Sequence, residues 1–165
     1  MIHRLLSFCS IGVLALLLSS CETTTDYGYF VDRFDDDAIV LMYRLMDEAV
    51  ARGDYEEYIS FFAPGFTQVD KSDANQPAYY GHEFFDQVEE IFNTTSMLEI
   101  RTVVMDIEYT VPGSEALVTV QEEEKRIQYG NTQHFTSLYE MQLGFEDGWI
   151  FINRSERTAF QVIDE

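Results

Sequence analysis

Carboxyl groups are the side chains of this sequence that could most readily do acid–base chemistry. The 165 residues include 30 Asp and Glu against 10 Lys and Arg, with 3 His and 2 Cys. His82 and His134 are far apart, and no His, Asp or Glu spacing resembles that of a zinc site. The sequence also lacks a Gly-rich phosphate loop, a nucleophile elbow and a catalytic cysteine. We therefore expect any chemistry to use carboxyl groups as acid and base, without a metal or cofactor.

The densest charge run is "EEEKR", from Glu122 to Arg126, in the middle of an expected strand. Because side chains alternate along a strand, this run is divided between two faces, and at least one charge points toward a crowded side. A buried charge requires a partner, and Arg101, Glu122 and Arg154 could pair across neighbouring strands inside the fold. The favoured interpretation places most of the run on a solvated face.

The start of the chain has the pattern of an export signal. Arg4 gives a short basic region, and Leu5–Leu18 form an apolar run that is short for a membrane-spanning helix. "LSSC", which ends at Cys21, resembles the lipobox of bacterial lipoproteins, in which the cysteine thiol receives a diacylglycerol. The resemblance implies that residues 1–20 are a signal peptide and that Cys21 is lipidated and anchors the chain to a membrane. The alternative is an ordinary signal peptide with an incidental cysteine.

The residue after the cysteine and the overall charge bear on location and partners. Glu22, by resemblance to enterobacterial sorting, favours an outer-membrane lipoprotein that faces the periplasm of the bacterial envelope. Loss of Arg4 with the signal would make the formal charge one unit more negative than the −20 of the full sequence. Such a surface repels nucleic acid, so we expect no nucleic-acid partner. The mature chain would also lack a disulfide, and its core alone would hold the fold.

The remaining sequence indicates one domain at residues 35–165 behind a polar tether at 21–34. Acidic residues at 35–37 open a first helix, which ends at Gly53. Asp54 caps a second helix, and Pro64 stops it. A strand at 66–70, a loop and a third helix from residue 81 to about 93 follow. Four longer strands, joined by hairpin turns, are expected at roughly 98–111, 116–129, 135–145 and 149–160.

Two stretches resemble the nuclear transport factor 2-like superfamily, which includes ketosteroid isomerases, scytalone dehydratases and SnoaL-like polyketide cyclases. They are "ARGDYEEYISFFAPGFTQVD" and "YEMQLGFEDGWIFINRSE". The resemblance implies an α+β cone with the element order α-α-β-α-β-β-β-β, in which a curved antiparallel sheet packs on three helices. It also implies a cavity between the helices and the concave face of the sheet. The fold by itself does not define an activity.

Comparison with ketosteroid isomerase supplies candidate catalytic residues. The resemblance places Asp70 at the general base and Glu140 at the carboxylic acid that the isomerase keeps protonated. The isomerase tyrosine falls on Met46, and the nearest phenol, Tyr43, is about one turn away. The catalytic set therefore lacks its third member at the expected position. The alternatives are that Asp70 is a solvated acid beside Lys71 and that Glu140 lies on the outer face of its strand.

Two functions follow from these observations. The first is a non-catalytic module that binds a small apolar ligand or a protein partner, which the tether and the incomplete catalytic set favour. The second is a cofactor-free isomerase, dehydratase or cyclase that uses cavity carboxylates. A homodimer through the outer face of the sheet is also expected, as in many proteins of this superfamily. The residues expected to line the cavity are Met46, Tyr58, Phe62, Phe85, Phe92 and Arg154.

Overall fold

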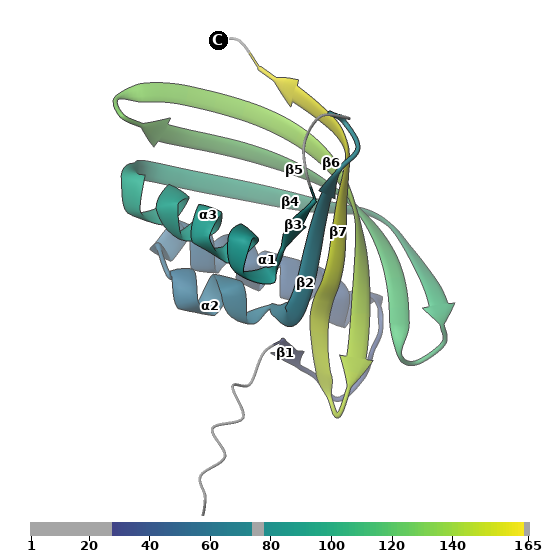
Figure 1. The fold of residues 1–165 in the computed structure, drawn as a ribbon. Helices are drawn as coiled ribbons and strands as arrows, with labels where there is room; N and C mark the ends of the chain where they lie inside the picture. Colours follow the sequence, from purple (N-terminus) through teal and green to yellow (C-terminus); the bar gives the residue numbers. More distant parts are fainter. Residues whose placement is uncertain (1–27, 74–77, 164–165) are drawn as a thin grey trace, which may run out of the picture.

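A computed structural model describes residues 28–73 and 78–163, in which three helices lie on one side of a long curved sheet (Figure 1). The predicted signal peptide at 1–20 and residues 21–27 of the predicted tether, Cys21 included, lie outside the described residues. Within the described part, no helix is long and apolar enough to span a membrane. The predicted α+β class is confirmed.

The helices α1 (Asp36–Arg52) and α2 (Tyr55–Ser60) begin where the sequence predicts. The Asp35 side chain accepts a hydrogen bond of 3.0 Å from the backbone N–H of Ala38, and Asp54 caps α2 in the same way. Gly53 ends α1 at a φ of 70°, in the left-handed region that glycine adopts without strain.

The second helix is shorter than predicted, because a strand starts before Pro64. Strand β2 (Phe62–Asp70) begins at Phe62, which pairs with Ile152 of β7 (Trp149–Val162). The backbone N–H of Ile152 also donates to the carbonyl of Phe61 over 2.9 Å. Pro64 lies within an irregularity between two stretches of regular pairing, where its missing N–H breaks no ladder bond.

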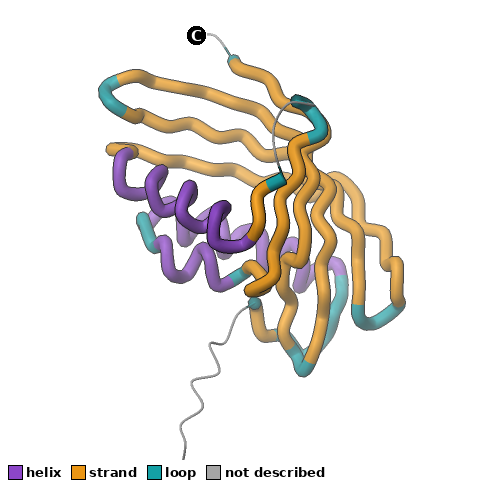
Figure 2. Tube along the Cα trace, in the orientation of Figure 1, coloured by secondary structure: helices purple, strands orange, loops and turns teal. Residues whose placement is uncertain are grey.

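The sheet has the strand order β3-β2-β7-β6-β5-β4, and β1 also pairs with β7 (Figure 2). Strand β2 runs parallel to β7, and the other pairs are antiparallel. Strands β2 and β7 can run parallel because a long stretch of chain connects them. Short hairpins join the strands from β4 to β7, and a short hairpin allows only an antiparallel pair. The remaining elements are β1 (Tyr29–Phe30), β3 (Tyr79–Tyr80), α3 (Gly81–Thr94), β4 (Thr95–Val111), β5 (Glu115–Gln128) and β6 (Asn131–Glu146).

Two short strands were not predicted from the sequence. Tyr29 and Phe30 of β1 lie inside the predicted tether but pair with Ile150 and Trp149. Strand β3 lies in the predicted loop before α3 and pairs with the end of β2. A two-residue strand is too short to show a periodic sequence pattern. Whether such a strand forms depends on its pairing with another strand of the sheet.

The core lies between α1 and the concave face of the sheet. Ile39 and Met42 of α1 are fully buried there. On β5, every second residue from Ala116 to Val120 points inward and is also fully buried. The same alternation carries Glu122 and Glu124 to the inner side of the strand. The apolar core therefore passes directly into a polar wall along a single strand.

Candidate functional site

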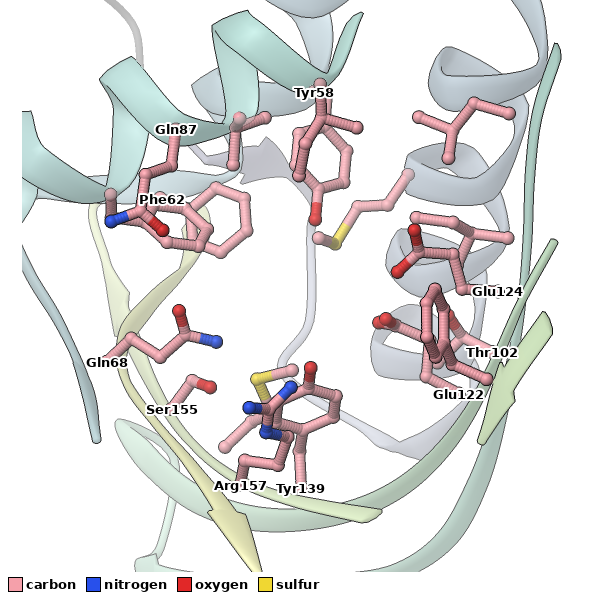
Figure 3. A pocket seen from close by; sticks show the side chains of 18 of the residues that line it. Tyr58, Phe62, Gln68, Gln87, Thr102, Glu122, Glu124, Tyr139, Ser155 and Arg157 are labelled. Carbon is pink, nitrogen blue, oxygen red and sulfur yellow. The ribbon is translucent and has the colours of Figure 1, made fainter. Parts of the chain in front are cut away.

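A cavity of about 390 Å³ lies between the three helices and the inner face of the sheet, within the size range of small-molecule sites (Figure 3). One part of its wall is apolar, and aromatic rings dominate that part. The ring of Phe62 is 4.8 Å from that of Phe66, whose centroid lies 4.6 Å from Phe84. The main contributors to this apolar part are Phe62, Phe66, Phe84 and Phe92. Leu98 and Ile100 also line the cavity, but from β4, where they pair with Arg126 and Glu124 of β5.

The opposite part of the cavity is acidic. Glu122 and Glu124 of β5 point into it (Figure 3), and Asp47 of α1 also lines it. Asp47 accepts hydrogen bonds from the backbone N–H and the hydroxyl of Thr102, at 2.8 and 2.7 Å. Thr102 is in turn the residue of β4 that lies opposite Glu122 in the sheet. Three carboxyl groups thus gather where α1 meets β4 and β5.

Burial favours the neutral forms of these carboxyl groups, and repulsion by the neighbouring carboxylates adds to this effect at Glu122. Burial, and then the nearby Glu124 and Asp47, raise the pKa of Glu122 to about 8, against a smaller opposing effect of Arg157. Burial raises the pKa of Asp47, although the hydrogen bonds from Thr102 oppose this. Burial also raises the pKa of Glu124, against the attraction of Arg126. At neutral pH, Glu122 therefore holds a proton inside the cavity.

Asp70 lies on the cavity wall in a different environment. It stands opposite Arg157 of β7 in the parallel strand pair, and the Arg157 side chain donates two hydrogen bonds to Asp70 Oδ2. Ser72 donates two more, from its backbone N–H at 2.9 Å and its hydroxyl at 2.6 Å. Burial opposes ionisation of Asp70, but these hydrogen bonds outweigh it and lower the pKa. Asp70 is therefore an ion-paired carboxylate.

Phenols and one hydroxyl complete the polar lining. Tyr43, Tyr58 and Tyr139 line the cavity, and burial, followed by the charge of Glu122, raises the pKa of each phenol. The hydroxyls of Tyr43 and Ser155, together with Glu124 Oε1, are buried without a hydrogen-bond partner among the described residues. Buried polar atoms without a partner are rare, because each costs about 1–3 kcal/mol. They mark positions where a bound molecule can form hydrogen bonds.

Two arginines stack on aromatic rings at one end of the cavity. The guanidinium of Arg126 lies 4.9 Å from the ring of Phe135, and that of Arg157 lies 4.6 Å from the ring of Phe160. The two rings stack on each other at 5.4 Å. Arg126 is also 3.3 Å from Glu124 Oε1, without hydrogen-bond geometry. Both cationic groups therefore already face a carboxylate.

The structure separates the predicted catalytic residues. Asp70 and Tyr43 line the cavity, but Glu140 does not. Its neighbours Tyr139 and Met141 point inward, so alternation puts Glu140 on the outer face of β6. Glu140 therefore cannot supply the carboxylic acid that the resemblance assigned to it, because its side chain lies outside the cavity.

Of the residues predicted to line the cavity, Met46, Tyr58, Phe62 and Phe92 do so. Phe85 is not part of the lining and packs against the rings of Phe66 and Phe84. Arg154 is also absent from the lining, since its exposed side chain pairs with Glu156.

The pairing of Arg101, Glu122 and Arg154, which was the less favoured interpretation of the charge run, is not formed. Arg101 is exposed and lies opposite Glu123 rather than Glu122. The interpretation that the charge run is mainly solvated is wrong for Glu122, Glu124 and Arg126, which line the cavity. The buried alternation just before Glu122 was the signal that could have found these residues.

Comparisons with known proteins define the fold. No known protein family and no curated protein matches this sequence. A scytalone dehydratase-like protein from Novosphingobium aromaticivorans superposes with a TM-score of 0.65, at 15% identity over 78% of this chain and 87% of that chain. A ketosteroid isomerase-like protein from Erwinia carotovora atroseptica gives 0.58, at 15% identity over 80% and 100%. A nuclear transport factor 2-like protein of unknown function from Shewanella oneidensis gives 0.58, at 16% identity over 73% and 96%.

These solved structures share the curved, unclosed sheet and the helices on its inner side. The chain therefore has the nuclear transport factor 2-like cone fold. The same fold carries dehydratase-like, isomerase-like and uncharacterised proteins, so the site must decide the function. Among residues 28–73 and 78–163, no group of three His, Cys, Asp or Glu side chains is placed to hold a metal ion.

Proposed function

We propose that this domain is a receptor for a small, mainly apolar molecule, which it binds in the cavity between the helices and the sheet. The observation that carries the proposal is the cavity of about 390 Å³, in which aromatic walls face buried polar atoms without partners. Large apolar walls with a few fixed polar groups are typical of ligand sites. The partners of Asp70 and the outward position of Glu140 favour binding over the isomerase chemistry that the resemblance implied.

A fluorescence experiment tests this proposal directly. The neutral probe N-phenylnaphthylamine should brighten on binding to a chain that begins at Glu22. Gln68→Trp should weaken the signal, because Gln68 points into the cavity and an indole there would take up part of the space for the probe (Figure 3). Gln142→Trp is the matched control, since Gln142 is exposed and lies outside the lining. Equal brightening with both variants would contradict binding in the cavity.

We further propose that a lipid on Cys21 holds this receptor at the bacterial outer membrane, with the domain in the periplasm. The support is the order of basic region, apolar run and "LSSC" in the sequence. Residues between Cys21 and β1 would then space the acidic domain from anionic headgroups.

A homodimer through the outer face of the sheet is a separate proposal. Val103 and Met105 of β4 are 41% and 58% exposed, which leaves apolar side chains along an edge strand. Light scattering on the chain from Glu22 onward tests it, and a monomer mass at high concentration would rule it out.

The second candidate function is cofactor-free acid–base catalysis, in which Glu122 replaces the predicted carboxylates. The specific observation is that its pKa is raised to about 8, near the pH where a general acid or base works best. Elimination of nitrobenzisoxazole requires only proton abstraction by a base and is a suitable probe. The rate should rise with pH through about 8 and be lost in Glu122→Gln. A rate unchanged by this substitution would exclude catalysis of proton abstraction by Glu122.

A further inference from the structure

Acidic side chains outnumber basic side chains in the cavity wall. Two of its carboxyl groups face guanidinium groups: Asp70 is bonded to Arg157, and Glu124 lies beside Arg126. Glu122 and Asp47 have no such partner, since no Lys or Arg of the described residues forms an ion pair with either. The cavity therefore contains two acidic groups in excess of its cations.

The protein compensates for this excess only in part. Thr102 supplies two hydrogen-bond donors to Asp47, and a proton neutralises Glu122. A buried carboxyl group without a cation takes up a proton, because its charged form is poorly solvated. A bound cation next to Glu122 would stabilise the charged form of this carboxyl group, so Glu122 would release its proton when the cation binds.

The groups around Glu122 suit an ammonium ion. Tyr43 is 2% exposed, and its hydroxyl oxygen lacks a partner and can accept a hydrogen bond. Glu124 Oε1, which also lacks one, can accept another. The rings of Tyr58 and Tyr139 line the same space, and aromatic faces attract cations. An ammonium ion has three N–H donors to share among carboxylate and phenol oxygens.

We propose that the cavity selects organic cations, with a protonated amine of the ligand between Glu122 and Asp47 and its apolar body against Phe62 and Phe92. This inference rests on the proposed receptor function and specifies the class of ligand. The amine occupies the acidic wall, and the body occupies the aromatic wall, where Phe62 lies across the cavity from Glu122 and Glu124 (Figure 3).

Two other charged ligands fit the site less well. An anion would have to bind at Arg157 or Arg126, and it would compete there with Asp70 or Glu124. A bare metal ion needs several ligands at fixed distances, and the described residues contain no such group of three. An organic cation needs only one or two carboxylates and an apolar space, both of which the cavity provides.

Binding is expected to depend on pH. The titratable or charged groups that surround Glu122 come from α1, α2, β5, β6 and β7, and they are Asp47, Tyr43, Tyr58, Glu124, Tyr139 and Arg157. Because Glu122 is protonated below about pH 8, amine binding at pH 7 should release roughly one proton. Amine affinity should then rise as the pH is raised from 6 toward about 8, where Glu122 becomes ionised without ligand.

The test is calorimetric titration of the full chain, kept in solution by a mild detergent, with three matched probes. Naphthylethylamine, naphthylethanol and naphthylacetate share one ring system and carry a positive, neutral or negative group. The amine should bind at least about tenfold more tightly than the alcohol, as a charge-assisted hydrogen bond to a buried carboxylate implies. Glu122→Gln should remove this advantage, so that the amine and the alcohol bind about equally. Glu123→Gln, the exposed neighbour on the other face of β5, should keep it.

The outcomes separate this inference from the receptor function. Equal affinities for amine and alcohol would overturn the cation preference and leave a receptor for apolar molecules standing. Tighter binding of naphthylacetate would overturn it in favour of an anion site. If the folded chain binds none of the three, both proposals fail. If Glu122→Gln does not fold, titration of the wild-type chain in buffers of different ionisation enthalpy decides, since amine binding without proton release would contradict the inference.

Discussion

Thr102 of β4 holds Asp47 of α1 through two hydrogen bonds, from its backbone N–H at 2.8 Å and its hydroxyl at 2.7 Å. The residues are far apart in the sequence, and the pair ties the first helix to the edge strand of the sheet. The carboxylate is held beside Glu122, which lies opposite Thr102 in the strand pair. This contact thus stabilises the fold and also sets the charge of the cavity.

Removal of the Thr102 hydroxyl should destabilise the domain. Thr102→Val keeps the shape of the side chain but leaves one oxygen of a half-buried carboxylate without its donor, at a cost of about 1–3 kcal/mol. The loss should be larger at pH 7 than at pH 4, because the substitution penalises the ionised form of Asp47. Urea denaturation measures the free energy of unfolding, with Thr119→Val on the other side of the sheet as control. A loss that does not vary with pH would contradict this role of the hydroxyl.

Glu122 should make the domain less stable as the pH rises. Its pKa is raised from 4.5 in the unfolded chain to about 8 in the folded chain, so unfolding releases a proton between these values. Stability is therefore highest below about pH 4.5 with respect to this group, and it falls until about pH 8. Glu122→Gln should remove that decline and be more stable than wild type at pH 8, by up to a few kcal/mol.

The matched measurement is thermal unfolding of the wild type, Glu122→Gln and Glu123→Gln across this pH range. Glu123 lies on the exposed face of β5, so its substitution should leave the pH dependence unchanged. A wild type and a Glu122→Gln variant with parallel pH profiles would show that Glu122 is not held neutral by the fold.

Much of the fold could be predicted, because its elements depend on local signals. Asp35 and Asp54 cap helices through their own side chains, and the position of Gly53 depends only on backbone conformation. Hairpin turns also act locally, and they fixed the order of β4 to β7. What depends on distant contacts could not be predicted. Strand β2 starts at Phe62 because Ile152 of β7 is there to pair with it, and no pattern near Pro64 records this.

The site was predicted in part, for a similar reason. Tyr58 and Phe62 were correctly placed in the lining, because apolar faces of helices and strands point inward. Glu140 was placed by analogy with a catalytic residue, although the alternation around it puts it on the outer face. The alternation on β5 pointed to Glu122, but a rule that buries apolar residues gives no reason to bury a carboxyl group. Its surroundings come from α1 and β7, which only the folded chain brings together.

Lipidation of Cys21 should determine where the protein is found. The wild-type chain is expected in the membrane fraction with the mass of a diacylglycerol adduct, because two or more acyl chains anchor a protein stably. Cys21→Ala should shift it to another fraction and remove the adduct. Cell fractionation and mass spectrometry of the intact protein measure both effects. An unmodified wild-type protein, or a variant that stays in the membrane fraction, would rule out the lipid anchor.

The ion pair between Asp70 and Arg157 should make an opposite contribution to the pH dependence. Hydrogen bonds from Arg157 and Ser72 lower the pKa of Asp70 despite its burial, so the folded state binds its proton less tightly than the unfolded state. The stabilisation is present above about pH 4 and is lost as the pH falls further through the lowered pKa. Asp70→Asn should therefore cost about 2 kcal/mol at pH 7, since it removes the partner of a half-buried guanidinium.

The same substitution tests whether Asp70 has a structural role through Arg157 that ligand binding does not need. If Asp70 only positions Arg157, Asp70→Asn should lower the free energy of unfolding while the cavity still binds N-phenylnaphthylamine. The difference in stability between wild type and variant should shrink as the pH is lowered below about 4, where the Asp70 carboxyl takes up its proton. Chemical denaturation at several pH values measures this difference. A constant difference across the acidic range would mean that the ionised form of Asp70 contributes nothing through Arg157.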